Sequence, residues 1–443
     1  MPSSEILLSG IFLRWNLLTK SEKVACLGIT LIPLWWLWGW SFLFVMLAAG
    51  ILSYEYYYHR KIQLKRPSFL IVAFLTYGFY DLIGSVFYSQ YHHASIGFRD
   101  LTDQFETVFA PSFILWYVQS RNIRVRLTVI AWAFSLVVLL MLIAWLYAVV
   151  IMHQAEFLPP RSLFGLLTKK PPQYEPGLGN TNYLIFYRAS DKSIPGFIRF
   201  FLFFHGPESL ALATSFIALI ALDLKHRIWS ISLFSGSILM LLMSGTRSAW
   251  LALPVILIIR WLLKTGAKQG AWLVCGLITF CSCLLMLPPV TDFLSDVSAK
   301  TAQSSNELRG DSSDVRAEIY RRTTERLLDS SDWELIMGHT VPGETVLREY
   351  EPAKVGTHSF YLGSLLYRQG LLGTGLFLIY WVSLSSWLYR TRHGRPIAAL
   401  LIIILMSFTF SVMAYESIVN PIILVCAITR QPETSNRRLY DGN

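Results

Sequence analysis

The sequence predicts an all-α polytopic membrane protein with about twelve transmembrane helices and one large external loop. Three observations predict this fold class. The chain of 443 residues is 54% hydrophobic and has a positive mean hydropathy, which is typical of multi-span membrane proteins. Apolar runs of about 18 residues or more recur along it, and each can cross a bilayer core of ~30 Å as a helix. Short connectors rich in Lys and Arg separate these runs, as the positive-inside rule requires of cytoplasmic loops.

The N-terminal part of the chain consists of apolar runs joined by short connectors. The first run, residues 24–54, is too long for one span, so we expect it to split at Trp38-Gly39-Trp40. The basic connector at residues 59–66 is placed in the cytoplasm. The next spans are expected over residues 68–89, 104–119 and 127–152.

Two long segments interrupt the rest of the chain, the first rich in proline, glycine and aromatic residues and the second polar. Residues 153–207 form a first outer segment, and residues 289–357 form the large outer loop, which carries an amphipathic helix from Asp314 to Leu328. Both termini are expected in the cytoplasm, and residues 1–443 form a single integral membrane domain. The remaining spans are expected over residues 208–222, 228–243, 249–263, 271–288, 358–389, 397–414 and 418–429.

Composition and missing motifs exclude several classes of function. The net charge of +10 is explained by cytoplasmic basic residues, so no nucleic-acid partner is expected. All 5 cysteines fall inside predicted spans, which leaves no disulfide framework in the loops. The chain has no P-loop, dinucleotide fingerprint, HExxH motif or Gly-x-Ser-x-Gly elbow. Because the aspartates of the outer face form no tight pair, we expect neither a metal nor a cofactor.

Ionisable residues from separate stretches collect on the predicted outer face, where such residues usually mark a functional path. Arg199, His205 and Glu208 precede one span, and Arg247 lies in the tight turn between two others. A guanidinium group fixed there suits a pyrophosphate, because it binds phosphate oxygens in pairs and stays charged. The alternative for Arg247 is an interfacial arginine that extends to lipid headgroups. His205 either orients a sugar together with Glu208 or caps the next helix.

The large loop supplies the other candidates. Arg316 and Tyr320 are four residues apart and share one helix face, which we expect to look into the bundle. The alternative is a solvated face on which Arg316 pairs with nearby acidic residues. Arg322 and Arg326 are weaker candidates for substrate binding. His358, where the loop enters an apolar span, is the candidate general base, although an interfacial histidine could simply form a hydrogen bond there.

These residues occur in an order that resembles a known family, the O-antigen ligase and polymerase superfamily. The turn SGTRSA at residues 244–249 is similar to its Ser/Thr-x-Ser/Thr-Arg-x-Ala motif. Arg316 and Tyr320 followed by Gly338 resemble its loop segment, and HSFYL at residues 358–362 followed by Gly370 and Gly373 resembles its histidine helix. Arg199 with residues 205–211 resembles an earlier arginine and Pro-Asn segment, although Glu208 replaces the common asparagine.

The resemblance, closest to the ligase branch, implies a glycosyltransferase of GT-C-like architecture in the inner membrane of a Gram-negative bacterium. The expected donor is a glycan on undecaprenyl pyrophosphate, and the expected acceptor is lipid A-core at the periplasmic face. Residues 153–207 and 289–357 would then be periplasmic. Arg247 and Arg316 would hold the pyrophosphate with help from Arg199, and His358 would activate the acceptor hydroxyl. Membrane lipids are the other expected partners.

Three other functions remain open from the sequence. An O-antigen polymerase would use the same donor with a lipid-linked acceptor, and a protein O-oligosaccharyltransferase commonly has a longer C-terminal extension. A transporter of lipid-linked glycans would place ionisable residues at mid-membrane in paired halves. The polar groups here gather at one predicted face without an internal repeat, which favours an enzyme.

Overall fold

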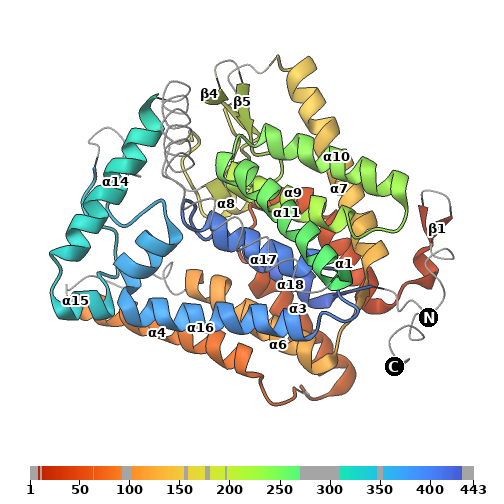
Figure 1. Cartoon of the computed structure of the whole chain (residues 1–443), viewed down its shortest axis with the longest axis horizontal. Coiled ribbons are helices and arrows are strands. Elements are labelled where there is room, and N and C mark those ends of the chain that lie inside the picture. The colour runs from red at the N-terminus through yellow and green to blue at the C-terminus, as the bar shows by residue number, and fades with distance from the viewer. Residues whose placement is uncertain are drawn as a thin grey trace.

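The protein is mostly helical (Figure 1), and among the residues that the structure describes five helices pack against one buried helix. The computed structural model describes residues 8–9, 12–62, 64–91, 102–153, 158–174, 180–194, 197–269, 310–346 and 353–431. Helices α14 (Gly310–Leu328) and α15 (Asp332–Met337) lie at one end of the molecule, on the left of Figure 1. Both described helices of the large loop therefore lie at the same end of the bundle.

The first apolar run breaks where the sequence predicted. Helix α1 (Lys20–Thr30) starts with a capping box between Thr19 and Glu22, and α2 (Ile32–Trp38) ends at Gly39. Gly39 has φ +100°, a conformation that glycine adopts at little cost. Helix α3 (Leu43–His59) then leaves at 112° to α2. The two helices therefore form a broken span or a re-entrant element.

The next predicted spans are also helices. Helix α4 is Phe69–Tyr91, the π-helix η3 (Phe105–Phe109) continues into α6 (Ala110–Arg121), and α7 is Leu127–Val150. Just before α7, strand β3 (Val125–Arg126) pairs in parallel with β6 (Thr429–Arg430), which follows the last described helix. This pairing ties the start of α7 to the end of the bundle.

Helix α9 (Pro207–Ala221) forms the centre of the protein. Every residue of α9 except Glu208 is buried, as expected for a helix that is apolar on all sides. It packs against α7, α10 (Arg227–Met243), α11 (Arg247–Gln269), α17 (Ala398–Thr409) and α18 (Val419–Ile428). Its first turn, which carries Glu208, is therefore held in place from several sides.

The C-terminal part begins with the large loop. The predicted amphipathic helix is present as α14, and a capping box between Ser331 and Glu334 starts α15. The span that begins near residue 358 forms the π-helix η5 (Phe360–Tyr367) and then α16 (Arg368–Arg390), which runs beside α4 (Figure 1). Helices α17 and α18 complete the bundle.

Short strands depart from the expectation of an all-α chain. Strands β4 (Tyr187–Ile194) and β5 (Phe197–Phe200) form an antiparallel hairpin in the first outer segment, and β1 (Leu8–Ser9) pairs with β2 (Phe12–Leu13). This hairpin was not predicted from the composition of residues 153–207, which are rich in proline, glycine and aromatic residues. Short helices also occur there and near the N-terminus: η2 (Trp15–Leu17), α8 (Leu163–Leu167) and η4 (Asn180–Asn182).

Three helical segments among the described residues are long and apolar enough to cross a membrane: Phe69–Phe87, Leu127–Val150 and Phe360–Arg390. If the bent pair α2 and α3 is counted as one span, the number of candidate spans among the described residues rises to 4. Helices α9, α10, α17 and α18 are apolar but shorter, at 10–17 residues. The predicted span at residues 271–288 and the start of the large loop, 289–309, lie outside the described residues. The structure thus supports a helical membrane-type protein, and the count of twelve remains an expectation.

Candidate active site: an arginine and histidine cluster

One short segment after α17 connects the stretches that the sequence singled out. The backbone N–H of Phe360, at the start of η5, donates to the carbonyl oxygens of Phe410 (3.0 Å) and Met413 (2.9 Å). The hydroxyl of Ser248 lies 3.1 Å from the sulfur of Met413. Three residues further on, Glu416 accepts a 2.7 Å hydrogen bond from Ser209 of α9. The entrance to η5, the first turn of α11 and the first turn of α9 therefore meet at residues 410–416.

Arg199 cross-links two of these stretches. Its Nε donates to the carbonyl oxygen of Ser244 (3.1 Å), and its Nη2 donates to Oε1 of Glu208 (3.0 Å). The arginine is 6% exposed, so both contacts form largely away from water. Breaking a buried pair from one side is costly, because the other charge stays buried. Arg199 thus fixes the turn at Ser244 relative to the first turn of α9.

Arg247 begins α11 directly after a tight turn. Gly245 has φ +63° in this turn, and Thr246 donates through its hydroxyl to the carbonyl oxygen of Pro207 at 3.1 Å. The guanidinium group of Arg247 is repelled electrostatically by those of Arg316 and Arg199. The turn therefore brings a second cation, beside Arg199, to the first turn of α9.

Arg316 and Tyr320 share one face of α14, as the sequence predicted, and both are half-buried. The hydroxyl of Tyr320 donates to the carbonyl oxygen of His358 at 3.4 Å. Arg316 interacts electrostatically with Glu208 and with His358. The large loop thus adds a cation and an aromatic ring to the same cluster.

His358 is held by its backbone and by Thr357. It has φ +67°, which is uncommon for a non-glycine residue and is often found at functional sites. Its Nδ1 lies 2.8 Å from the hydroxyl oxygen of Thr357, and that hydroxyl donates to the carbonyl oxygen of Lys354 at 2.6 Å. Since the hydroxyl proton is engaged, Nδ1–H must donate to Thr357, which leaves Nε2 as the basic nitrogen.

The surroundings of His358 keep its imidazole neutral. Burial lowers the pKa of His358 below its usual value, the nearby Arg316 lowers it further, and Glu208 partly opposes them. A neutral imidazole can accept a proton near neutral pH, and Glu208 would then stabilise the imidazolium. The arrangement suits a general base.

Glu416 was not among the site residues predicted from the sequence. Burial is the largest cause that raises its pKa to about 7, and the negative charge of Glu208 adds to it. The two carboxylates flank Gly206, since a Cβ added there would lie 3.5 Å from Glu208 and 4.0 Å from Glu416. A glutamate in a short link between two apolar segments is a signal that could have identified it.

Two predicted substrate-binding arginines do not join the cluster. Arg322 donates to Glu318 at 2.7 Å and lies 3.8 Å from Glu344. Arg326 is exposed and lines, with Arg322, a separate depression beside Tyr367. At 100° per residue on a helix, positions six and ten beyond Arg316 point away from the face that Arg316 and Tyr320 occupy. Arg322 and Arg326 therefore lie apart from the cluster, and their role in substrate binding stays a prediction.

His205 lies at the edge of the cluster. Its ring packs against Trp40 with centroids 5.8 Å apart, and burial lowers the pKa of His205 to about 4. The N-cap of α9 is Gly206, without a side-chain cap, so His205 does not cap the helix as one alternative suggested.

Fold and site together define a helical protein with candidate membrane spans and a largely half-buried cluster of three arginines, two glutamates and one histidine. Within the described ranges, no three His, Cys, Asp or Glu side chains are placed to hold a metal ion. No protein-family model matches the chain, and no curated protein sequence matches it. The function is therefore argued from the site.

Proposed function

We propose that the protein is an O-antigen ligase. It would transfer O-antigen polysaccharide from undecaprenyl pyrophosphate to a sugar hydroxyl of lipid A-core, by metal-independent inverting glycosyl transfer. The observation that carries the proposal is the convergence of Arg199, Arg247 and Arg316 with His358. Strand β5, the first residue of α11, α14 and the entrance to η5 each supply one of these four residues. The twelve-span topology and the periplasmic orientation of the cluster belong to the proposal.

The cations suit a diphosphate. Arg316 and Arg199 both repel Arg247, and a diphosphate between these groups would offset that repulsion. Their guanidinium groups can bind its oxygens in pairs and stabilise charge that develops on the leaving oxygen. Arg199 is already engaged by Glu208 and Ser244, so Arg247 and Arg316 would make the main contacts.

His358 suits the acceptor. In the proposed step, an acceptor hydroxyl oxygen attacks the anomeric carbon of the donor sugar and forms the new glycosidic bond. The bond between that carbon and the diphosphate oxygen breaks, and its electron pair remains on the diphosphate. The hydroxyl proton moves to Nε2 of His358, where Glu208 stabilises the resulting charge. Direct displacement inverts the anomeric centre.

The deciding experiment offers the purified full-length protein both classes of acceptor. It is incubated with glycan on undecaprenyl pyrophosphate and either lipid A-core or a second lipid-linked repeat. We expect a glycan–lipid A-core product and release of undecaprenyl pyrophosphate. Extension of the lipid-linked glycan alone would identify a polymerase instead. Transbilayer movement of the donor without any product would identify a transporter.

A further inference from the structure

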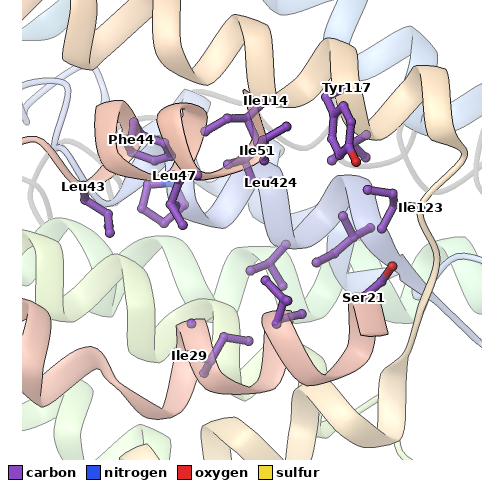
Figure 2. Close-up of a pocket in the computed structure, with 18 of the residues that line it drawn as sticks. Ser21, Ile29, Leu43, Phe44, Leu47, Ile51, Ile114, Tyr117, Ile123 and Leu424 are labelled. Atoms are coloured by element: carbon purple, nitrogen blue, oxygen red, sulfur yellow. The ribbon is translucent and has the colours of Figure 1, made fainter. Parts of the chain in front are cut away.

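A long apolar groove runs between helices whose lining residues take no part in the candidate site. It has a volume of about 1410 Å³ and lies between α1, α3, α6, α9 and α18. Figure 2 shows α1, with Ser21 and Ile29, on one side and α3, with Leu43, Leu47 and Ile51, on the other. Small-molecule sites typically measure about 300–1,000 Å³, so this groove suits a larger, chain-like apolar ligand.

Helix α18 shows how the groove is oriented relative to the arginine and histidine cluster. Ile418, Ile422, Val425 and Ile428 all line it and follow one face of the helix. Ile418 lies two residues after Glu416, a member of the cluster, whereas Ile428 adjoins β6. The groove therefore runs from near the cluster to the end of the bundle where β3 and β6 pair.

The end near the cluster is aromatic. Trp40 stacks on Phe204 with ring centroids 5.9 Å apart, and its indole N–H donates to the carbonyl oxygen of Phe203 at 3.0 Å. Both rings line the groove. This end offers an apolar surface.

The end away from the cluster is basic. Lys20, Lys23, Arg121 and Arg124 line it. Arg121 is neutralised by an ion pair with Glu55. Among the described residues the two lysines form no ion pair; Lys20 lies over the ring of Tyr58 (5.6 Å) and Lys23 over that of Trp15 (5.8 Å). Lys20, Lys23 and Arg124 thus supply positive charge at the mouth of an apolar groove.

We propose that this groove binds a diacyl phospholipid with an anionic headgroup. Its phosphate would lie at Lys20, Lys23 and Arg124, and its acyl chains would extend along α18 toward Trp40. Basic pockets between membrane helices bind anionic headgroups through such pairing of charge with buried hydrocarbon. Because its cations lie at the end away from the cluster, the groove holds the headgroup outside the candidate active site. The inference is independent of the proposed transferase function.

Two glycines allow the groove to be filled without disturbing the fold. Gly28 of α1 and Gly50 of α3 line the groove, and a Cβ added to either would meet nothing within 4 Å. The double variant Gly28→Leu/Gly50→Leu should therefore narrow the groove from both walls. Gly84→Leu/Gly375→Leu is the matched control, because Gly84 of α4 and Gly375 of α16 have equally open surroundings outside the groove.

The experiment measures lipid binding to the full-length, delipidated protein by native mass spectrometry. The probes are palmitoyl-oleoyl phosphatidylglycerol and phosphatidylcholine with the same chains. We expect the wild type to prefer phosphatidylglycerol, and Gly28→Leu/Gly50→Leu to weaken its binding about tenfold or more while the control pair leaves it unchanged. Thermal unfolding of each variant checks that the fold is retained.

A charge series tests the headgroup end. Lys20→Gln/Lys23→Gln should remove most of the preference for phosphatidylglycerol, whereas Lys65→Gln/Arg66→Gln, outside the groove, should not. Equal binding of both lipids by the wild type would overturn the proposal. So would undiminished phosphatidylglycerol binding by the folded leucine pair, or displacement of phosphatidylglycerol by equimolar undecaprenyl phosphate.

Discussion

At the level of single residues, the imidazole of His358 is set up by its own backbone and by the residue before it. The left-handed backbone turns the side chain toward Thr357, whose hydroxyl is committed to Lys354 as a donor. The ring therefore donates from Nδ1 and presents Nε2. A positively charged neighbour, Arg316, disfavours its protonated form.

Replacing His358 with alanine should reduce transfer by about 10²–10⁴-fold, the usual contribution of a general base, and leave a folded membrane protein. In the wild type, the base must be neutral, and burial lowers the pKa of His358 below its usual 6.5. The rate should therefore be constant across neutral pH and fall only as the medium becomes more acidic than pH 6.5. The initial rate of product formation, measured against pH for the wild type and the alanine variant, checks both the rate loss and the pH profile. A variant with wild-type rates would refute the assignment.

Thr357, the residue before His358, should affect the rate of transfer because it fixes which ring nitrogen of His358 carries the proton. Thr357→Val removes the acceptor for Nδ1–H, so kcat should fall about tenfold while KM for the donor stays unchanged. Thr357→Ser keeps the hydroxyl and should retain the wild-type rate and pH profile. If serine and valine behave alike, the hydroxyl does not position the imidazole.

Arg247→Lys should weaken donor binding although the positive charge is kept. Lysine cannot bind two phosphate oxygens with a planar fork, and hydrogen bonds to charged groups contribute about 1.5–3 kcal/mol. We expect the Kd for undecaprenyl pyrophosphate to rise at least about tenfold, measured by titration of the purified variant. Donor affinity equal to that of the wild type would contradict the role of Arg247.

At the level of elements, Gly338 and Gly370, which belong to the motifs that resemble the superfamily, hold the large loop against helix α16. Gly338, at the end of α15, has φ +84°, and Gly370, at a kink in α16, has φ +66°. A Cβ added to either would lie 2.5 Å from the backbone nitrogen of the other. Only glycine permits this approach, which fixes α15 on α16 and thereby the loop that carries Arg316.

Gly370→Ala should therefore destabilise the protein, because it adds a steric conflict to an unfavourable φ. We expect the loss to exceed ~1 kcal/mol and to lower donor binding as α14 moves. Gly375→Ala, five residues further along α16 with open surroundings, is the control and should be neutral or stabilising. Thermal unfolding in detergent compares the two. Equal melting temperatures would show that the contact is unimportant.

At the level of the whole molecule, the proposed orientation places the large loop and the basic connector after α16 on opposite sides of a membrane. A single cysteine at Asp329, exposed after α14, should react with an impermeant thiol reagent in spheroplasts; one at His393, exposed after α16, should react only after permeabilisation. Labelling of both positions from the same side would exclude the topology, and with it the periplasmic site.

The sequence by itself determined the helices and the candidates for the site. Its apolar runs gave α4, α7, α9, α10, α17 and α18 within a few residues, because the length and composition of such runs leave a helix as the stable solution. The grouping of Arg199, Arg247, Arg316 and His358 also followed from placing their stretches on one face.

Only the tertiary structure decided which of these side chains act together. In the folded protein Arg199 pairs with Glu208, and Glu416 lies in the same cluster. Arg322 and Arg326 line a separate depression. The groove between α1 and α3 likewise exists only in the folded protein. The physical reason is that helix patterning is local in the chain. A hydrogen bond, a pKa shift or a cavity depends on side chains that packing brings together from distant segments, such as Ser209 and Glu416.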